Sequence, residues 1–261
     1  FDNQFKSQLT ADAEAVGGQA FEAGFRNLTW LNENTLNFTK QYGQHAVNLL
    51  GGFTAQRTQI ERNSALGQGF PPGGLERVSS AASIVSATSY GTGFSLASFL
   101  GRINYGFNNR YLLTLTARAD GSSRFSKNNR FGFFPSASAA WRLSDESFFR
   151  HNLFTDLKLR VSYGLTGDQE IGDFQNISFY GPSRYDGLPG IQLRNIADPD
   201  LRWQNNRMLN VGVDYEVKGG QFSGSVEFFK SNKNRLLSED IIPGTTGFST
   251  VTSNSGITRI E

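Results

Sequence analysis

The chain has 261 residues, and its 25 basic and 23 acidic side chains are interspersed and leave a net charge of +2. This balance excludes a dedicated nucleic-acid binder, which would show a basic face or run. No cysteine is present, which excludes disulfide frameworks, thiolate catalysis and Cys-ligated zinc. No apolar run approaches the ~20 residues that a transmembrane helix needs. This excludes membrane-spanning helices but not membrane-spanning strands.

In the first third of the chain, period-two alternation predicts a weak strand over 24–40 and a clearer one over 45–57. The connection between them, at about 41–44, is very short. A long connection is expected at about 58–96.

The middle of the chain contains a predicted hairpin. Residues 99–107 and 110–120 both alternate, and Asn108-Asn109 between them is a pair that tolerates positive φ. A further strand is predicted over 131–141.

The last third repeats the pattern over 157–163, 209–216 and 222–228, and Gly219-Gly220 forms a tight turn between the last two strands. Helical periodicity is not convincing anywhere. The sequence therefore predicts an all-β chain of roughly nine strands.

Short and long connections alternate along the chain. The connection at 143–155 is moderate, and those at 167–205 and from 232 onward are long. Strands near 10 residues with tight turns at one end and large loops at the other are typical of an up-and-down antiparallel transmembrane β-barrel. A soluble β-sandwich carbohydrate-binding module would also show alternation and remains an alternative.

Aromatic residues gather in two bands about a strand length apart, as in the girdles at membrane interfaces. The band at the short-turn end comprises Tyr105, Phe107, Tyr111, Trp141, Tyr215 and Phe222, and the other band comprises Phe125, Phe131 and Phe133. Pro135, which has no N–H to donate, predicts a bulge or break in its strand.

Signals of catalysis are weak. His45 and His151 are isolated, and no G-x-S-x-G motif is present. The run "GDQEIGD" over 167–173 holds three carboxylates without EF-hand spacing, so a solvated loop is favoured over a calcium site. We therefore expect no enzyme activity, no cofactor and no metal.

The loop 167–205 is the best candidate for binding. Its segment "SFYGPSRYDG" places Phe179, Tyr180, Arg184 and Tyr185 close together, and aromatic residues with polar neighbours suit contacts to sugars or peptides. In the loop after 120, Arg124, Lys127 and Arg130 are expected to be solvated.

Several long segments carry a family resemblance. "NRYLLTLTARADGSSRFSKNNRFGFFPSASAAWRLSDESFF" (109–149), "LKLRVSYGLTGDQEIGDFQ" (157–175) and "DPDLRWQNNRMLNVGVDY" (198–215) resemble the barrel of SusC/RagA-type TonB-dependent transporters of the Bacteroidota outer membrane. With "QYGQHAVNLLGGFTAQ" (41–56) and "FFKSNKNRLL" (228–237), the resemblance extends from about residue 28 to 240.

The resemblance implies import of glycan oligomers or peptides, with a SusD-like surface lipoprotein as a lid and energy from TonB–ExbB–ExbD. Family barrels have about 22 strands around an N-terminal plug. We therefore expect residues 1–261 to be a central part of the barrel, without the plug, the TonB-contacting segment and the end of the barrel. Outer-membrane lipid would contact the apolar face, and a siderophore- or cobalamin-type receptor is the alternative within this architecture.

Overall fold

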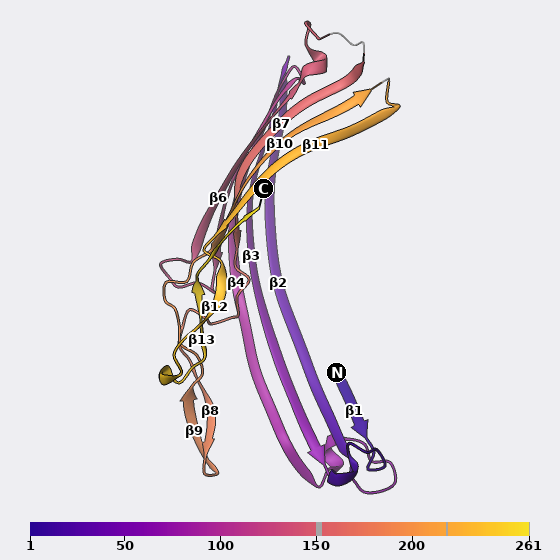
Figure 1. Ribbon diagram of the computed structural model, residues 1–261, viewed down its shortest axis with the longest axis vertical. Coiled ribbons are helices and arrows are strands. Elements are labelled where there is room, and N and C mark those ends of the chain that lie inside the picture. The colour runs from indigo at the N-terminus through magenta and orange to yellow at the C-terminus, as the bar shows by residue number, and fades with distance from the viewer. Residues whose placement is uncertain (150–152, 218, 261) are drawn as a thin grey trace. The chain divides into compact units, whose positions relative to one another are not determined.

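The structure is a computed structural model that describes residues 1–149, 153–217 and 219–260. Within these residues the regular elements are fourteen β-strands and four single-turn 3-10 helices (Figure 1). The predicted all-β class is confirmed. The predicted count of roughly nine strands is too low, because several of the additional strands have only four to six residues.

The chain divides into two compact units, which are described separately. The first comprises Phe1–Trp30 and Gln56–Phe94, and the second comprises Leu31–Ala55 and Ser95–Glu261. Three long strands contribute residues to both units: β2 (Gln19–Tyr42), β3 (His45–Gln68) and β4 (Ser83–Phe107).

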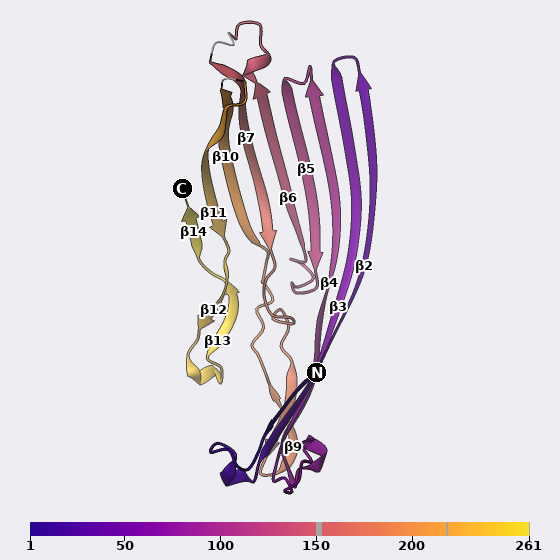
Figure 2. The same cartoon turned by 90° about the vertical axis from the view of Figure 1, so that its right-hand side faces the viewer.

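The second unit is built from antiparallel strands that lie side by side (Figure 2). After β4 the sheet order is β5, β6, β7, β10, β11 and β14. The bounds of these strands are Tyr111–Ser122, Phe131–Arg142, Phe154–Asp168, Gln204–Val217, Phe222–Asn234 and Ile257–Ile260. Most neighbours in the sheet are also neighbours in the chain, which is the order of an up-and-down barrel wall rather than of a sandwich.

Tight turns join the strands at one end, as predicted. Asn108 and Asn109 have φ of 52° and 56°, and Gly219 and Gly220 have φ of 66° and 92°. Positive φ at both central positions matches the right-handed twist of the flanking strands, which explains the Asn-Asn and Gly-Gly pairs. The moderate connection after β6 contains the 3-10 helix η3 (Leu143–Asp145).

Register aligns the alternating residues into rows across the sheet, because residues directly opposite each other share a face. One apolar row is Tyr105, Leu113, Ala139, Val161, Val211 and Phe228. The adjacent polar row is Asn104, Thr114, Ser138, Ser162 and Asn210. The predicted segregation into an apolar and a polar face is therefore confirmed in these strands.

The first unit contains β1 (Asp2–Lys6), η1 (Glu14–Val16), η2 (Val78–Ser80) and segments of β2, β3 and β4. Its small core comprises Ala20, Phe70 and Val78, and the Phe5 ring packs edge-on against Phe70 at 5.2 Å.

The predicted long connection over 58–96 is wrong, since β3 continues to Gln68 and β4 begins at Ser83. Side chains on both faces of the early part of β4 are exposed. Such a segment has no requirement for alternation, and so it lacks the period-two signal.

A second core in the second unit is formed by Phe125, Phe134, Leu201 and Trp203. The assignment of Phe125 to an interfacial aromatic band is therefore wrong, because its ring is fully buried against Phe134, Leu201 and Trp203, at the end of the sheet where the long loops lie, here called the outer loops. Phe131 and Phe133 are 60% and 63% exposed, as expected for side chains on the lipid face. The predicted band at the short-turn end is present. There the Tyr111 ring stacks with the rings of Phe107 and Trp141, and the distance between ring centroids is 6.2 Å in both pairs.

The predicted irregularity at Pro135 affects the pairing of β6 with β7 and not its pairing with β5. Towards β5 the register is unbroken, with Pro135 opposite Ala117, so no bulge forms there. Towards β7 the pairing begins at Ser136. A residue that cannot donate a ladder hydrogen bond thus lies where the β6–β7 ladder stops.

Candidate functional site: the polar face and the outer loops

A charged network crosses the polar face of the second unit on β7, β10 and β11. Arg160 Nε donates to both carboxylate oxygens of Asp214 at 3.0 and 3.1 Å, and its terminal nitrogen contacts Glu227. Lys158 Nζ lies 2.9 Å from the same aspartate. Gly212 makes room for this crossing, because a Cβ there would lie 3.2 Å from the Arg160 guanidinium.

Uncharged groups continue the polar face towards β2. Thr114 Oγ1 donates to Asn104 Oδ1 at 2.9 Å, and Asn104 Nδ2 donates to Asn48 Oδ1 at 3.0 Å. Asn48 Nδ2 in turn donates to Asn37 Oδ1 at 2.7 Å. These satisfied amides and hydroxyls form a hydrophilic wall rather than a catalytic constellation.

At the loop end of the polar face lies a groove of about 450 Å³. On one side, Arg118 Nε donates to the Asp120 carboxylate at 2.7 and 2.8 Å, and an Arg118 terminal nitrogen donates to Ser98 Oγ at 3.2 Å. Phe134 and Trp203 provide an apolar side. The groove thus combines hydrogen-bond donors, hydrogen-bond acceptors and apolar surface.

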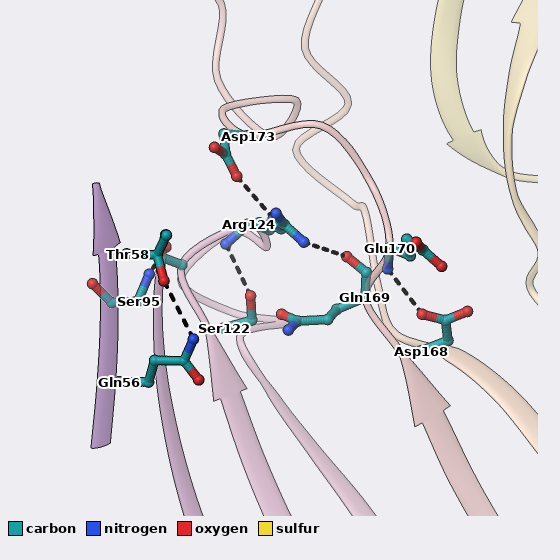
Figure 3. A network of polar contacts seen from close by, with 10 residues as sticks. Gln56, Thr58, Ser95, Ser122, Arg124, Asp168, Gln169, Glu170 and Asp173 are labelled. Atoms are coloured by element: carbon teal, nitrogen blue, oxygen red, sulfur yellow. Dashed lines mark hydrogen bonds and ion pairs between the residues drawn. The ribbon is translucent and has the colours of Figure 1, made fainter. Parts of the chain in front are cut away.

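An ion pair joins two outer loops above this end of the sheet (Figure 3). Arg124 Nε donates to Asp173 Oδ1 at 2.8 Å, and its NH1 donates to the Gln169 carbonyl at 3.4 Å. The two charged side chains are only 18% and 8% exposed. The prediction that Arg124 is solvated is wrong, whereas Lys127 and Arg130 are exposed as predicted.

Other polar contacts fix the remaining loops. Trp203 Nε1 donates to the Arg130 carbonyl at 2.9 Å. Asn254 accepts from the Arg202 amide at 2.7 Å and donates to the carbonyls of Arg202 and Arg235 at 2.8 and 3.1 Å. Sequence reasoning missed Asn254, because an asparagine in a polar loop gives no signal of its distant partners.

The four predicted contact residues lie on or beside the hairpin of β8 (Tyr180–Tyr185) and β9 (Leu188–Leu193). Its two-residue turn has positive φ at both positions, 48° and 77°. All four side chains are exposed, and strand alternation places Tyr180 and Arg184 on one face and Tyr185 on the other. The structure does not gather them into one site, and substrate contact by Phe179, Tyr180, Arg184 and Tyr185 stays a prediction.

At the short-turn end, the Glu146 carboxylate accepts hydrogen bonds from three side chains. Tyr111 Oη donates at 2.5 Å, Trp141 Nε1 at 3.0 Å and an Arg110 terminal nitrogen at 3.5 Å. The hydrogen bonds from Tyr111 and then Trp141 hold the pKa of the Glu146 carboxyl below its ordinary value. Sequence reasoning identified both aromatic residues but not the acid that joins them.

The titratable residues that the sequence singled out lie in separate places within the described part of the chain. His45 is not isolated, since its Nδ1 lies 2.7 Å from Tyr105 Oη, while His151 lies outside the described residues. Asp168 Oδ1 accepts from the Glu170 amide at 2.9 Å, and Asp173 binds Arg124 instead of completing a carboxylate cluster. In the described ranges no group of three or more His, Cys, Asp or Glu could hold a metal ion.

Among the described residues, no helix is long and apolar enough to cross a membrane.

An antiparallel sheet with one apolar and one polar face, tight turns and long loops defines the wall of a transmembrane β-barrel. The family described as "TonB dependent receptor-like, beta-barrel" matches residues 2–261. The chain belongs to this family of TonB-dependent receptors.

Individual relatives agree with this assignment. A TonB-dependent receptor of Formosa agariphila is 32% identical over 98% of this chain and 27% of its own length. The TonB-dependent receptor SusC of Bacteroides thetaiotaomicron is 38% identical over 65% of this chain and 18% of its own. The RagAB peptide transporter superposes with a TM-score of 0.87 at 25% identity, over 93% of this chain and 28% of that one. The chain therefore spans between 18% and 28% of the length of these relatives.

Proposed function

We propose that this chain is part of the barrel of an outer-membrane transporter that imports glycan oligomers or peptides by a TonB-dependent mechanism. The observation that supports the proposal most strongly is the segregation of polar and apolar rows in register over β4, β5, β6, β7 and β10. A wall with a lipid face and a hydrated face is what a large solute pathway across the outer membrane requires.

In this proposal each part of the polar face has a role. The Arg160–Asp214–Glu227 network and the amides around Asn104 line a hydrated lumen. The groove beside Arg118 and Asp120 contacts substrate at the outer mouth. The proposed activity is transport without bond chemistry, and the similarity to SusC and to the RagAB peptide transporter supports it.

The proposed partners are a SusD-like surface lipoprotein, which would cap the outer loops, and TonB–ExbB–ExbD, which would supply energy through parts of the protein that this chain does not contain. A plug domain and further strands would complete the barrel around residues 1–261. The similarity to SusC and to RagAB supports these proposals.

Uptake of fluorescent oligomers by cells that express the full-length protein tests the proposal. Maltooligosaccharides and mixed peptides of matched length serve as probes, and an isogenic strain without TonB serves as the control. We expect saturable uptake of one class that is lost without TonB. Uptake that is the same in both strains would contradict active import.

A ferric siderophore and cobalamin extend the panel to the alternative type of receptor. TonB-dependent uptake of either compound, with no uptake of oligomers, would contradict the proposed substrate class.

A further inference from the structure

Basic side chains gather on the apolar face of the second unit, at the end where the outer loops lie. Alternation along β10 places Arg207 on the same face as Leu209 and Val211. Arg207 lies directly opposite Asn232 of β11, and Asn232 lies opposite Arg259 of β14. These three strands lie side by side (Figure 2). The face that is apolar in the middle of the sheet therefore becomes basic towards the outer loops.

A pocket of about 460 Å³ opens beside Arg207. No acidic residue lines it, and its polar lining consists of two arginines and three asparagines: Arg207, Arg235, Asn205, Asn234 and Asn254. Both arginines are exposed. Guanidinium and amide groups are hydrogen-bond donors, so this lining is suited to an anion.

Hydrogen bonds from Asn254 fix the loop side of the pocket. Its Nδ2 donates to the Arg235 carbonyl at 3.1 Å and to the Arg202 carbonyl at 2.8 Å. Arg235 has a φ of 58°, a backbone conformation that non-glycine residues adopt at a cost. Asn254 thus holds in place the main chain that carries one of the two arginines.

The pocket lies at the outer boundary of the apolar face. Tyr215 of β10 belongs to the aromatic band at the short-turn end, and Asn205 lies near the other end of the same strand. The segment between them is about as long as the 9–11 residues that a strand needs to cross a membrane. Between these two levels, the face presents Val211 and Phe228, which are opposite each other and exposed. Both β10 and β11 have a strand neighbour on each side, so Arg207 is not at an open edge of the sheet.

We propose that this pocket binds the phosphate group of a membrane lipid in the leaflet on the side of the outer loops. Arg207 and Arg235 would hold the phosphate, because planar guanidinium groups match phosphate oxygens in bidentate geometry. The acyl chains of the same lipid would lie on the apolar surface around Val211 and Phe228. A transported solute does not match this position, because Arg207 is on the face opposite to the proposed lumen lining. The inference rests on the proposed membrane position of the chain but not on what the protein transports.

The direct test is lipid binding to the purified full-length protein in detergent, measured by native mass spectrometry. The probe is lipid A with its phosphate groups, and the matched control is the same lipid after enzymatic dephosphorylation. We expect at least about ten-fold weaker binding of the dephosphorylated lipid, since it loses the charge-assisted hydrogen bonds to the arginines. Equal binding of both lipids, or no binding of either, would overturn the proposal. The measurement needs no transport, so its failure is distinguishable from failure of the uptake assay.

Inorganic phosphate distinguishes a lipid from a free anion. In large excess it should not displace phosphorylated lipid A, because it lacks the apolar contacts that the acyl chains make with Val211 and Phe228. Displacement would show that the pocket takes a free anion and would overturn the assignment to a lipid.

A double variant with Arg207→Gln and Arg235→Gln locates the site. We expect it to bind phosphorylated lipid A at least about ten-fold more weakly and the dephosphorylated lipid as the wild type does. The matched control combines Lys127→Gln with Arg130→Gln, which removes the same charge from exposed residues of an outer loop. All four side chains are exposed, so both double variants should keep the thermal stability of the wild type. Undiminished binding by the first variant, or an equal loss in both, would refute the assignment to this pocket.

Discussion

At the scale of single residues, Leu115 and Thr114 separate the two faces of the sheet. Leu115 is 42% exposed and lies opposite Ala137, whereas Thr114 lies opposite Ser138 and donates to Asn104. Neighbours in sequence thus occupy environments that differ in polarity, which allows a matched comparison.

We expect Leu115→Arg to cost about 2–4 kcal/mol of barrel stability if the residue lies near the membrane midplane, because a guanidinium on the lipid face loses its hydration. Thr114→Arg should cost much less, since its charge would enter the hydrated lumen. Urea titration of the full-length protein refolded in lipid vesicles measures both variants. Equal losses would refute the assignment of the two faces.

Arg124 and Asp173 give a second prediction at this scale. Their side chains are mostly buried where the two outer loops meet, and removal of one partner leaves a poorly hydrated charge. A double-mutant cycle with Arg124→Ala and Asp173→Ala should give a coupling energy of about 0.5–3 kcal/mol. Lys127→Ala, an exposed basic residue in the same loop, should show no coupling to Asp173. Coupling near zero for both pairs would show that the ion pair does not hold the loops together.

At the scale of elements, the turn that follows β6 places the Glu146 carboxylate within hydrogen-bond distance of two residues of the aromatic band. Glu146 receives hydrogen bonds from Tyr111 and Trp141, and its pKa in the folded protein lies below the ordinary 4.5. A group whose pKa is lowered on folding stabilises the protein above its unfolded pKa, and this stabilisation is lost as the pH falls through the folded value.

We therefore expect Glu146→Gln to be less stable than the wild type at neutral pH and to approach it as the pH falls below about 4.5. Denaturant unfolding in lipid at several pH values, followed by tryptophan fluorescence, measures the difference. A stability difference that does not change with pH would show that the Glu146 charge has no part in the contact.

The elements also show what the sequence could predict. The hairpin around Asn108-Asn109 was predictable because turn chemistry and alternation agreed over two full strands. The early part of β4 was not, since its two exposed faces impose no alternation on the sequence. The buried position of Phe125 depends on Leu201 and Trp203, which are distant in the chain, so no local pattern distinguishes it from Phe131.

The candidate site was predictable as a surface but not as a set of contacts. Alternation identified polar positions such as Thr114, and the family resemblance identified their role in a barrel wall. The ion pair of Arg124 with Asp173 joins residues 49 apart, and charge patterning alone cannot select such a partner. The same limit applies to Glu146, whose three donors come from two different strands and a turn.

At the scale of the whole molecule, the chain provides a wall whose two faces differ in polarity, and this difference is the central claim of the proposed function. The chain has no cysteine, so single cysteines can be introduced into it without background labelling from these residues. Adjacent positions in three neighbouring strands provide matched pairs: Leu113 and Thr114, Ala139 and Ser138, and Val161 and Ser162.

Cysteine accessibility in the full-length protein embedded in lipid vesicles measures this difference most directly. We expect a membrane-impermeant maleimide to label cysteine at Thr114, Ser138 and Ser162. For nitroxide spin labels attached at Leu113, Ala139 and Val161, we expect a high collision rate with oxygen dissolved in the lipid. We expect a low collision rate with a water-soluble paramagnetic relaxation agent. Alternation in both measurements across all three strands is the predicted result. Equal labelling of both positions in each pair, or the reverse pattern, would contradict the assignment of this chain to a transporter wall.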